Sequence, residues 1–112
     1  MMKHVHYSKV EKEPVELDGA EGVSVRWVIN EADGAKNFAM RVFEVEADGR
    51  TPYHDHDWEH EVFILSGSGF VCAEGQDTSL VPGDVVFVPG GEKHNFKAGS
   101  KGLTFICLVP YQ

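Results

Sequence analysis

The chain has 112 residues, enough for one hydrophobic core but too few for two, so we predict a single domain over residues 1–112. Its 42% hydrophobic and 25% charged residues are typical of a folded globular protein and exclude a disordered or low-complexity chain. The net charge of -8 argues against a surface for nucleic acid or anionic membrane, where Lys and Arg would have to neutralise phosphates.

The N-terminal segment has no clear strand pattern. We expect residues 1–15 to form an N-terminal arm or an edge strand exchanged with a partner. The segment lacks an apolar stretch of signal-peptide length, and no window of about 18 apolar residues occurs in the chain to span a bilayer. We therefore expect a cytoplasmic protein without membrane contact. Cys72 and Cys107 are too far apart for a Cys-x-x-Cys site and indicate reduced thiols.

The rest of the chain has the pattern of an all-β protein. Short runs rich in Val, Phe and Ile alternate with turns that contain Gly, Asp or Pro, as in a barrel or sandwich. No segment has a long helical period. We predict strands at residues 23–30, 38–46, 60–66, 69–73, 85–88, 94–97 and 103–109, with turns at 31–34, 48–50, 67–69, 82–84 and 89–91.

Histidines are concentrated between two of these strands. His54, His56 and His60 all lie at even positions, so in an extended chain His54 and His56 point the same way, and His60 joins them if the parity survives the bend before it. His94 begins another predicted strand after a Pro-Gly-Gly turn that could deliver it to the same place. Packed or solvent-facing histidines are the alternative, which would explain a lone histidine better than a group of them.

Imidazole nitrogens are good ligands for divalent Mn, Fe, Co, Ni, Cu and Zn. Four such ligands leave one or two coordination positions open, where a substrate or dioxygen could bind. The sequence therefore predicts one divalent transition-metal ion per chain, held by His54, His56, His60 and His94.

Other residues are candidates for a pocket beside the metal. Arg41 interrupts an apolar strand and would anchor a carboxylate if it faces inward; a solvated arginine at an edge is the alternative. Trp58, Phe96, Phe63 and Phe87 could form an apolar wall, although each is also an ordinary core aromatic.

The spacing of the histidines resembles the two motifs of the cupin superfamily, G(x)5HxH(x)3-4E(x)6G and G(x)5PxG(x)2H(x)3N. His54-Asp-His56 fits the first pair of ligands, and residues 83–94 fit the second motif through its histidine. Two departures affect turns or supporting contacts: Gly49 is one residue closer to His54 than the motif requires, and Ala98 stands where the motif has asparagine.

A third departure changes a ligand. Counting back from Gly67, the family's glutamate falls on His60, whereas Glu61 lies one residue out of register and on the opposite face. We therefore assign the ligand role to His60; if the strand parity fails, Glu61 replaces it and the site becomes the family's common set of three histidines and one glutamate.

A four-histidine site resembles a small subgroup of single-domain cupins in which manganese is found. The resemblance implies manganese as the ion, with Fe, Ni, Zn, Co or Cu as alternatives. The same subgroup has a cysteine at the position of Cys107, inside the barrel, where packing is a commoner role than nucleophilic attack.

The resemblance implies an all-β cupin fold, the double-stranded β-helix or jelly-roll β-barrel. It also implies a homodimer and a metalloenzyme of the oxidoreductase or dioxygenase type, acting on a small organic substrate at the four-histidine site. A non-catalytic, metal-dependent module that binds a small carboxylate or sugar is the alternative, because cupins include binding proteins as well as enzymes.

Overall fold

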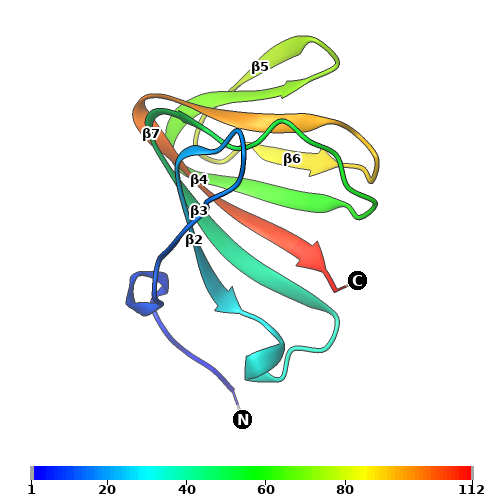
Figure 1. Ribbon diagram of the computed structural model, residues 1–112. Helices are drawn as coiled ribbons and strands as arrows, with labels where there is room; N and C mark the ends of the chain where they lie inside the picture. The colour runs from blue at the N-terminus through cyan, green and yellow to red at the C-terminus, as the bar shows by residue number, and fades with distance from the viewer. Residues whose placement is uncertain (1, 112) are drawn as a thin grey trace.

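The computed structural model describes residues 2–111, which fold mainly into β-strands (Figure 1). Two short 3-10 helices, η1 (Tyr7–Lys9) and η2 (Glu31–Asp33), are the helical turns of this part of the chain, and neither is long and apolar enough to cross a membrane. The all-β class is confirmed. The strands are β1 (Glu13–Pro14), β2 (Glu21–Ile29), β3 (Phe38–Arg50), β4 (His60–Ala73), β5 (Gln76–Leu80), β6 (Val85–Val88) and β7 (His94–Pro110).

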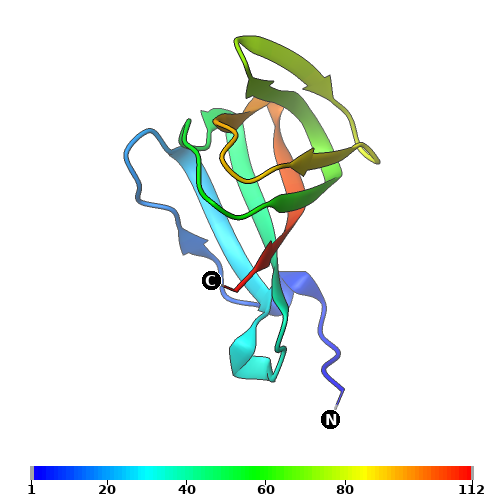
Figure 2. The ribbon, with the colours of Figure 1, turned by 90° about the vertical axis from the view of Figure 1, so that its right-hand side faces the viewer.

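The strands form one antiparallel sheet that curls into a barrel. Their order is β1-β2-β3-β7-β4-β5, and β6 pairs with β4. The long strand β7 pairs with both β3 and β4 and so joins the two sides. Figures 1 and 2 show β2 and β3 in one wall and β4, β5 and β6 in the other. This is the predicted jelly-roll barrel of the cupins.

Alternation along β4 decides which side chains enter the barrel. His60, Val62 and Ile64 are buried, with 8%, 4% and 0% exposure, whereas Glu61 and Phe63 are exposed. Successive side chains of a strand point to opposite faces, so His60 shares the inner face with the apolar core. The core cluster consists of Val23, Val45, Val62, Ile64, Leu80, Phe96, Ala98, Leu103, Phe105 and Cys107.

Several predicted turns are bulges within continuous strands. The predicted strands 60–66 and 69–73 are one strand, β4, because Gly67 bends the chain at a φ of 85° without ending the pairing with β7. A Cβ at Gly67 would lie 2.1 Å from the carbonyl oxygen of Gly102, so only glycine fits there. In the same way β3 continues through 48–50, and β7 joins the predicted strands 94–97 and 103–109.

One strand, β5, was not predicted, and the expected N-terminal arm contains a short edge strand, β1, that pairs within the chain. β5 is mostly polar and exposed, and it forms a hairpin with β4 through Glu74 and Gly75, both at positive φ as tight hairpins require. β1 lies in the N-terminal arm and pairs with β2 of the same chain. Lys3 holds the arm further along, with its Nζ 2.8 Å from the carbonyl oxygen of Val28 and 2.9 Å from Asp33.

Candidate metal centre

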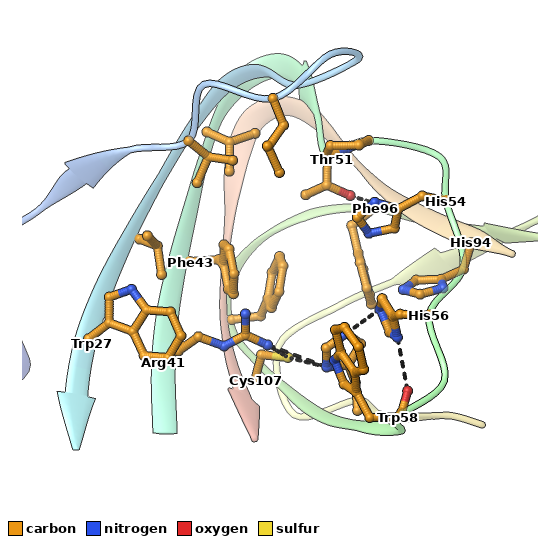
Figure 3. A pocket seen from close by; sticks show the side chains of 17 residues that line it. Trp27, Arg41, Phe43, Thr51, His54, His56, Trp58, His94, Phe96 and Cys107 are labelled. Atoms are coloured by element: carbon orange, nitrogen blue, oxygen red, sulfur yellow. Dashed lines mark hydrogen bonds between the residues drawn. The ribbon is translucent and has the colours of Figure 1, made fainter. Parts of the chain in front are cut away.

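A cavity of about 290 Å³ lies inside the barrel. All four histidines line it, and so do the predicted pocket residues Arg41, Trp58, Phe96 and Cys107. Figure 3 shows His54, His56 and His94 together on one side of the cavity. Among the described residues that line the cavity there is no aspartate or glutamate. The interior is therefore apolar apart from imidazoles, a thiol, one threonine and one guanidinium.

Three of the histidines meet at one point. Nitrogens of His56, His60 and His94 all lie within 4.8 Å of one another. The ring centroids are 4.3 Å apart for His56 and His60, and 5.3 Å apart for His56 and His94. They come from separate elements, since His56 precedes β4, His60 begins β4 and His94 begins β7. Strand pairing thus brings together residues far apart in the sequence.

His54 lies beside this group. Its backbone pairs with that of His94 through two N–H···O bonds of 3.1 and 3.0 Å. Its ring centroid is 5.3 Å from that of His56 and 6.0 Å from that of His94, and the residue is the most exposed of the four. The fourth imidazole is therefore a neighbour of the other three, at the solvent side of the cluster.

Backbone carbonyls orient two of the imidazoles. Nδ1 of His56 donates to the carbonyl oxygen of Trp58 at 2.9 Å, and Nδ1 of His94 donates to that of Glu92 at 2.8 Å. A carbonyl only accepts hydrogen bonds, so in each neutral ring Nδ1 carries the hydrogen and Nε2 keeps its lone pair. Histidines that ligate metals are commonly held in this way.

Side chains surround the third imidazole. Nδ1 of His60 lies 3.3 Å from Nη2 of Arg41 and 3.4 Å from Sγ of Cys107. Nε2 of His60 lies 2.7 Å from Nε2 of His56, which is a hydrogen bond donated by His60 when no ion separates them. As a metal ligand, His60 would instead carry its hydrogen on Nδ1 and donate it to Cys107.

The surroundings favour neutral imidazoles. Burial, followed by the positive charge of Arg41, lowers the pKa of His60 to about 3. Burial also lowers the pKa of His54 and of His94. Metal ligation requires the neutral form, and the lowered pKa values of these three rings favour it. The donor set therefore fits a divalent transition metal.

The alternative ligand Glu61 faces the other way. It is exposed and lines a shallow groove on the outside of the barrel, together with Phe87 and Leu108. Phe63 and Phe87, expected as cavity walls, also lie on this outer face, with 44% and 60% of their surface exposed. That part of the expectation is wrong, because both residues have the opposite strand parity to the inward-facing side chains.

Other aromatic residues form the walls. Trp27, Phe43 and Phe105 line the cavity but were not selected from the sequence. Phe43 is two residues from Arg41, and Phe105 is two residues from Cys107, so strand alternation could have placed both with their predicted neighbours. Trp27 lies on β2, outside both histidine motifs.

Comparisons with known proteins agree with this fold. The family model described as a cupin domain matches residues 41–110. A solved structure of the polyketide cyclase RemF from Streptomyces resistomycificus superposes with a TM-score of 0.95 and 37% identity, over 100% of this chain and 81% of that chain. A cupin-2 domain protein from Rhodospirillum rubrum has a TM-score of 0.85 at 23% identity, over 100% of this chain and 76% of that chain, which is a likeness of fold alone.

A curated relative from Rhodospirillum rubrum matches over part of the chain. It is a 1-methylthio-D-xylulose 5-phosphate methylsulfurylase, 34% identical over 71 residues, which are 62% of this chain and 46% of the relative. The chain thus spans less than half the length of that protein.

Proposed function

The chain belongs to the cupin family of barrel domains, and we propose that within this family it is a metal-dependent cyclase that closes a ring in a poly-β-keto chain. The observation that carries the proposal is the likeness to a polyketide cyclase, at 37% identity over the whole chain. The cavity agrees with such a substrate, since it joins an imidazole cluster to walls of flat aromatic rings.

We propose that His54, His56, His60 and His94 hold one divalent ion, with manganese as the first candidate. The closeness of three of their nitrogens and the carbonyl-fixed tautomers of His56 and His94 support this ligand set. A bound ion would supply Lewis acidity, which polarises a carbonyl oxygen and acidifies the methylene beside it.

The chain's own side chains would bind and fold the substrate. Phe105 stacks against Phe43 and Phe96, with ring centroids 5.3 and 4.7 Å apart, and the three rings form a continuous apolar surface. A flexible chain packed against this surface can bring a methylene carbon close to a distant carbonyl carbon, which removes much of the entropic cost of ring closure. The methylene carbon gives up one proton and bonds to the carbonyl carbon, while the carbonyl double bond opens and its oxygen takes up a proton to become a hydroxyl. Dehydration then removes this hydroxyl with the remaining hydrogen of the former methylene carbon, so the net loss is one water.

A single assay tests this proposal. Manganese-loaded protein is incubated with a synthetic poly-β-keto substrate, while mass spectrometry follows the product and an electrode follows dissolved oxygen. We expect a product lighter by one water without oxygen uptake, and none above background with the His60→Ala variant. No acceleration over the spontaneous reaction, with manganese or with any other divalent ion of the set, would contradict the proposal.

An oxidoreductase of the dioxygenase type is the second candidate. The imidazole-only donor set favours it, because such ligands also suit redox-active manganese and iron. In the same assay, extended to phenolic and dicarbonyl compounds, this function would consume oxygen and yield a product that contains it.

A non-catalytic module for a small carboxylate or sugar is the third candidate. It is favoured by the absence of aspartate and glutamate from the described cavity lining, since these residues are common general bases. Saturable binding without turnover of any compound in the panel would support it.

We also propose that the protein is a homodimer. Val85, Phe87 and Phe63 form an apolar patch on the outside of β4 and β6, with 73%, 60% and 44% exposure. A second copy is the proposed occupant, because the groove that contains the patch is lined by apolar side chains and, among the described residues, by a single carboxylate, Glu61, which limits repulsion between two acidic chains there. Light scattering should give a dimer for wild type and a monomer for Phe87→Asp; a monomeric wild type would contradict the proposal.

A further inference from the structure

We infer that the substrate enters the cavity as a free carboxylate and that Arg41 binds this group, an inference that rests on the proposed function and specifies its substrate class. The geometry of Arg41 points to it. The guanidinium lies 5.3 Å from the ring centroid of Trp27 and 4.9 Å from that of Phe43, which hold it on β3. From there it reaches into the cavity toward the histidines (Figure 3).

Arg41 keeps hydrogen-bond donors free. Its Nη2 donates to Sγ of Cys107 at 3.1 Å and faces Nδ1 of His60. Its Nε is buried without a partner among the described residues, and none of them bonds Nη1. A guanidinium presents its hydrogens in planar forks that match a carboxylate. Because Nε is enclosed by the protein, a carboxylate at Arg41 would take its bonds at the Nη1 and Nη2 end of the group, where Nη1 is unused.

The charge of Arg41 is also unbalanced. The chain has three arginines, and two of them pair with glutamates: Arg26 with Glu44 at 2.8 Å and Arg50 with Glu21 at 3.2 Å. Arg41 has no such partner in the described chain, and no carboxylate lines its cavity. An arginine remains protonated at any ordinary pH, and a partly buried charge requires a counter-charge. An anionic ligand would supply it.

The position of Arg41 relative to His60 defines the ligand further. Nη2 lies on the Nδ1 side of the His60 ring, whereas Nε2 faces His56 on the other side. If its carboxylate bound Arg41 and another of its oxygens faced the imidazole cluster, the ligand would have these two groups on opposite sides of the His60 ring. The substrate class is a β-keto or aryl carboxylic acid with its body between the aromatic walls. A thioester, which lacks the negative charge, would not satisfy Arg41.

Ligand binding tests the inference without turnover. Both tryptophans of the chain, Trp27 and Trp58, line the cavity, so their fluorescence should report binding. The probes are 2-naphthoate and its neutral isostere 2-naphthamide, titrated into metal-free and manganese-loaded protein. We expect at least about tenfold tighter binding of the carboxylate in both forms, as for a charge-assisted pair.

Substitutions locate the site. Arg41→Gln should lose the preference for the carboxylate, Arg41→Lys should keep part of it, and Arg26→Gln is the matched control on the outside of the barrel that should keep it fully. Equal affinity of wild type for the two probes would overturn the inference, and so would an unchanged preference in Arg41→Gln. If Arg41→Gln does not fold, the wild-type ratio and Arg41→Lys still decide.

The failure of this inference can be told apart from failure of the proposed function. A naphthoate preference that depends on Arg41, without any cyclisation, would refute the cyclase and leave the carboxylate site. Cyclisation that proceeds equally well with the free acid and its thioester, without a naphthoate preference, would refute the carboxylate site and leave the cyclase.

Discussion

The cluster contains two kinds of histidine. His56 and His94 donate Nδ1–H to the carbonyl oxygens of Trp58 and Glu92, each two residues away, at 2.9 and 2.8 Å. His60 instead faces side chains on its Nδ1 side. A backbone carbonyl survives any substitution of its residue, whereas a side-chain partner does not. The backbone thus fixes the ring orientations of His56 and His94. The orientation of His60 depends on side chains and can be tuned by substitution, so we call it the tunable histidine.

The tunable histidine connects two parts of the cavity. Its Nε2 contacts His56, and its Nδ1 contacts Arg41 and Cys107. If His60 held a metal through its Nε2 lone pair, its hydrogen would be on Nδ1, and Arg41 would lose the acceptor that it faces in the metal-free protein. Metal loading would therefore release a donor of Arg41 for an anionic ligand.

Removal of the tunable histidine should have the largest effect. We expect wild-type protein to carry about one ion per chain. His60→Ala should lose most of this metal, since the substitution removes one of the neutral nitrogen ligands. Elemental analysis after dialysis measures the content. Glu61→Ala is the matched control, one residue along β4 and on the outer face, and should keep its metal. Loss of metal in Glu61→Ala would show that the carboxylate, not His60, is the ligand.

Acid should next reveal how His60 differs from an ordinary histidine. In the unfolded chain its pKa is near 6.5, whereas in the folded protein burial lowers it to about 3. Between these two pKa values the unfolded chain binds a proton at His60 and the folded protein does not. The free energy of unfolding therefore falls as the pH drops from about 6.5 toward about 3, by at most about 1.4 kcal/mol per pH unit for each such histidine. His54 and His94 contribute in the same direction.

Urea unfolding of metal-free protein at a series of pH values between about 7 and 4 measures this loss. His60→Gln removes the largest shift and should flatten the pH dependence. An equally steep dependence in His60→Gln would mean that other groups cause the acid sensitivity.

The side-chain support of His60 should have a smaller effect on metal binding. Cys107→Ala removes the sulfur that would accept from Nδ1 of His60 if His60 held a metal, and we expect about tenfold weaker metal binding, as for the loss of such supporting contacts elsewhere. Cys72→Ala is the control, because its thiol is about equally buried, at 6% against 4% exposure, and among the described residues it bonds to none of the four histidines, although its backbone pairs with Asn95 beside His94. Equal metal affinities of the two variants would show that Cys107 does not support metal binding through His60.

The sequence predicted the parts of the fold that depend on local pattern. The all-β class and strand 85–88 followed from alternation and turn residues, whereas the sequence left open whether Arg41 faces inward, and the structure places it in the cavity lining. The bulge at Gly67 could not be told from a turn, because both need a glycine at positive φ and only pairing with β7 keeps the strand continuous. The residues around Gly67 do not indicate which distant strand pairs with them, so the bulge could not be predicted from them.

The site was predictable to a similar extent. Spacing and the resemblance predicted His54, His56 and His94 as neighbours, and the structure places all three in the cavity lining. The choice between His60 and Glu61 depended on whether parity survived a bend, and β4 begins only at His60. Trp27 gave no signal, since its role comes from the closure of the barrel around Arg41. Residues that act through long-range packing need the structure to identify them.

Trp58 should give the smallest effect on metal binding, and it tests the comparison most directly. Its indole stacks on the ring of His56, with centroids 4.7 Å apart and planes 8° apart, yet the atom that orients His56 is its backbone oxygen. Trp58→Leu keeps that oxygen, so we expect a loss of about 0.5–1.5 kcal/mol in stability from the lost stacking, and metal affinity within about threefold of wild type by calorimetry. A tenfold loss of affinity would mean that the indole orients His56, so that His56, like His60, would depend on side chains and only His94 would be fixed by the backbone.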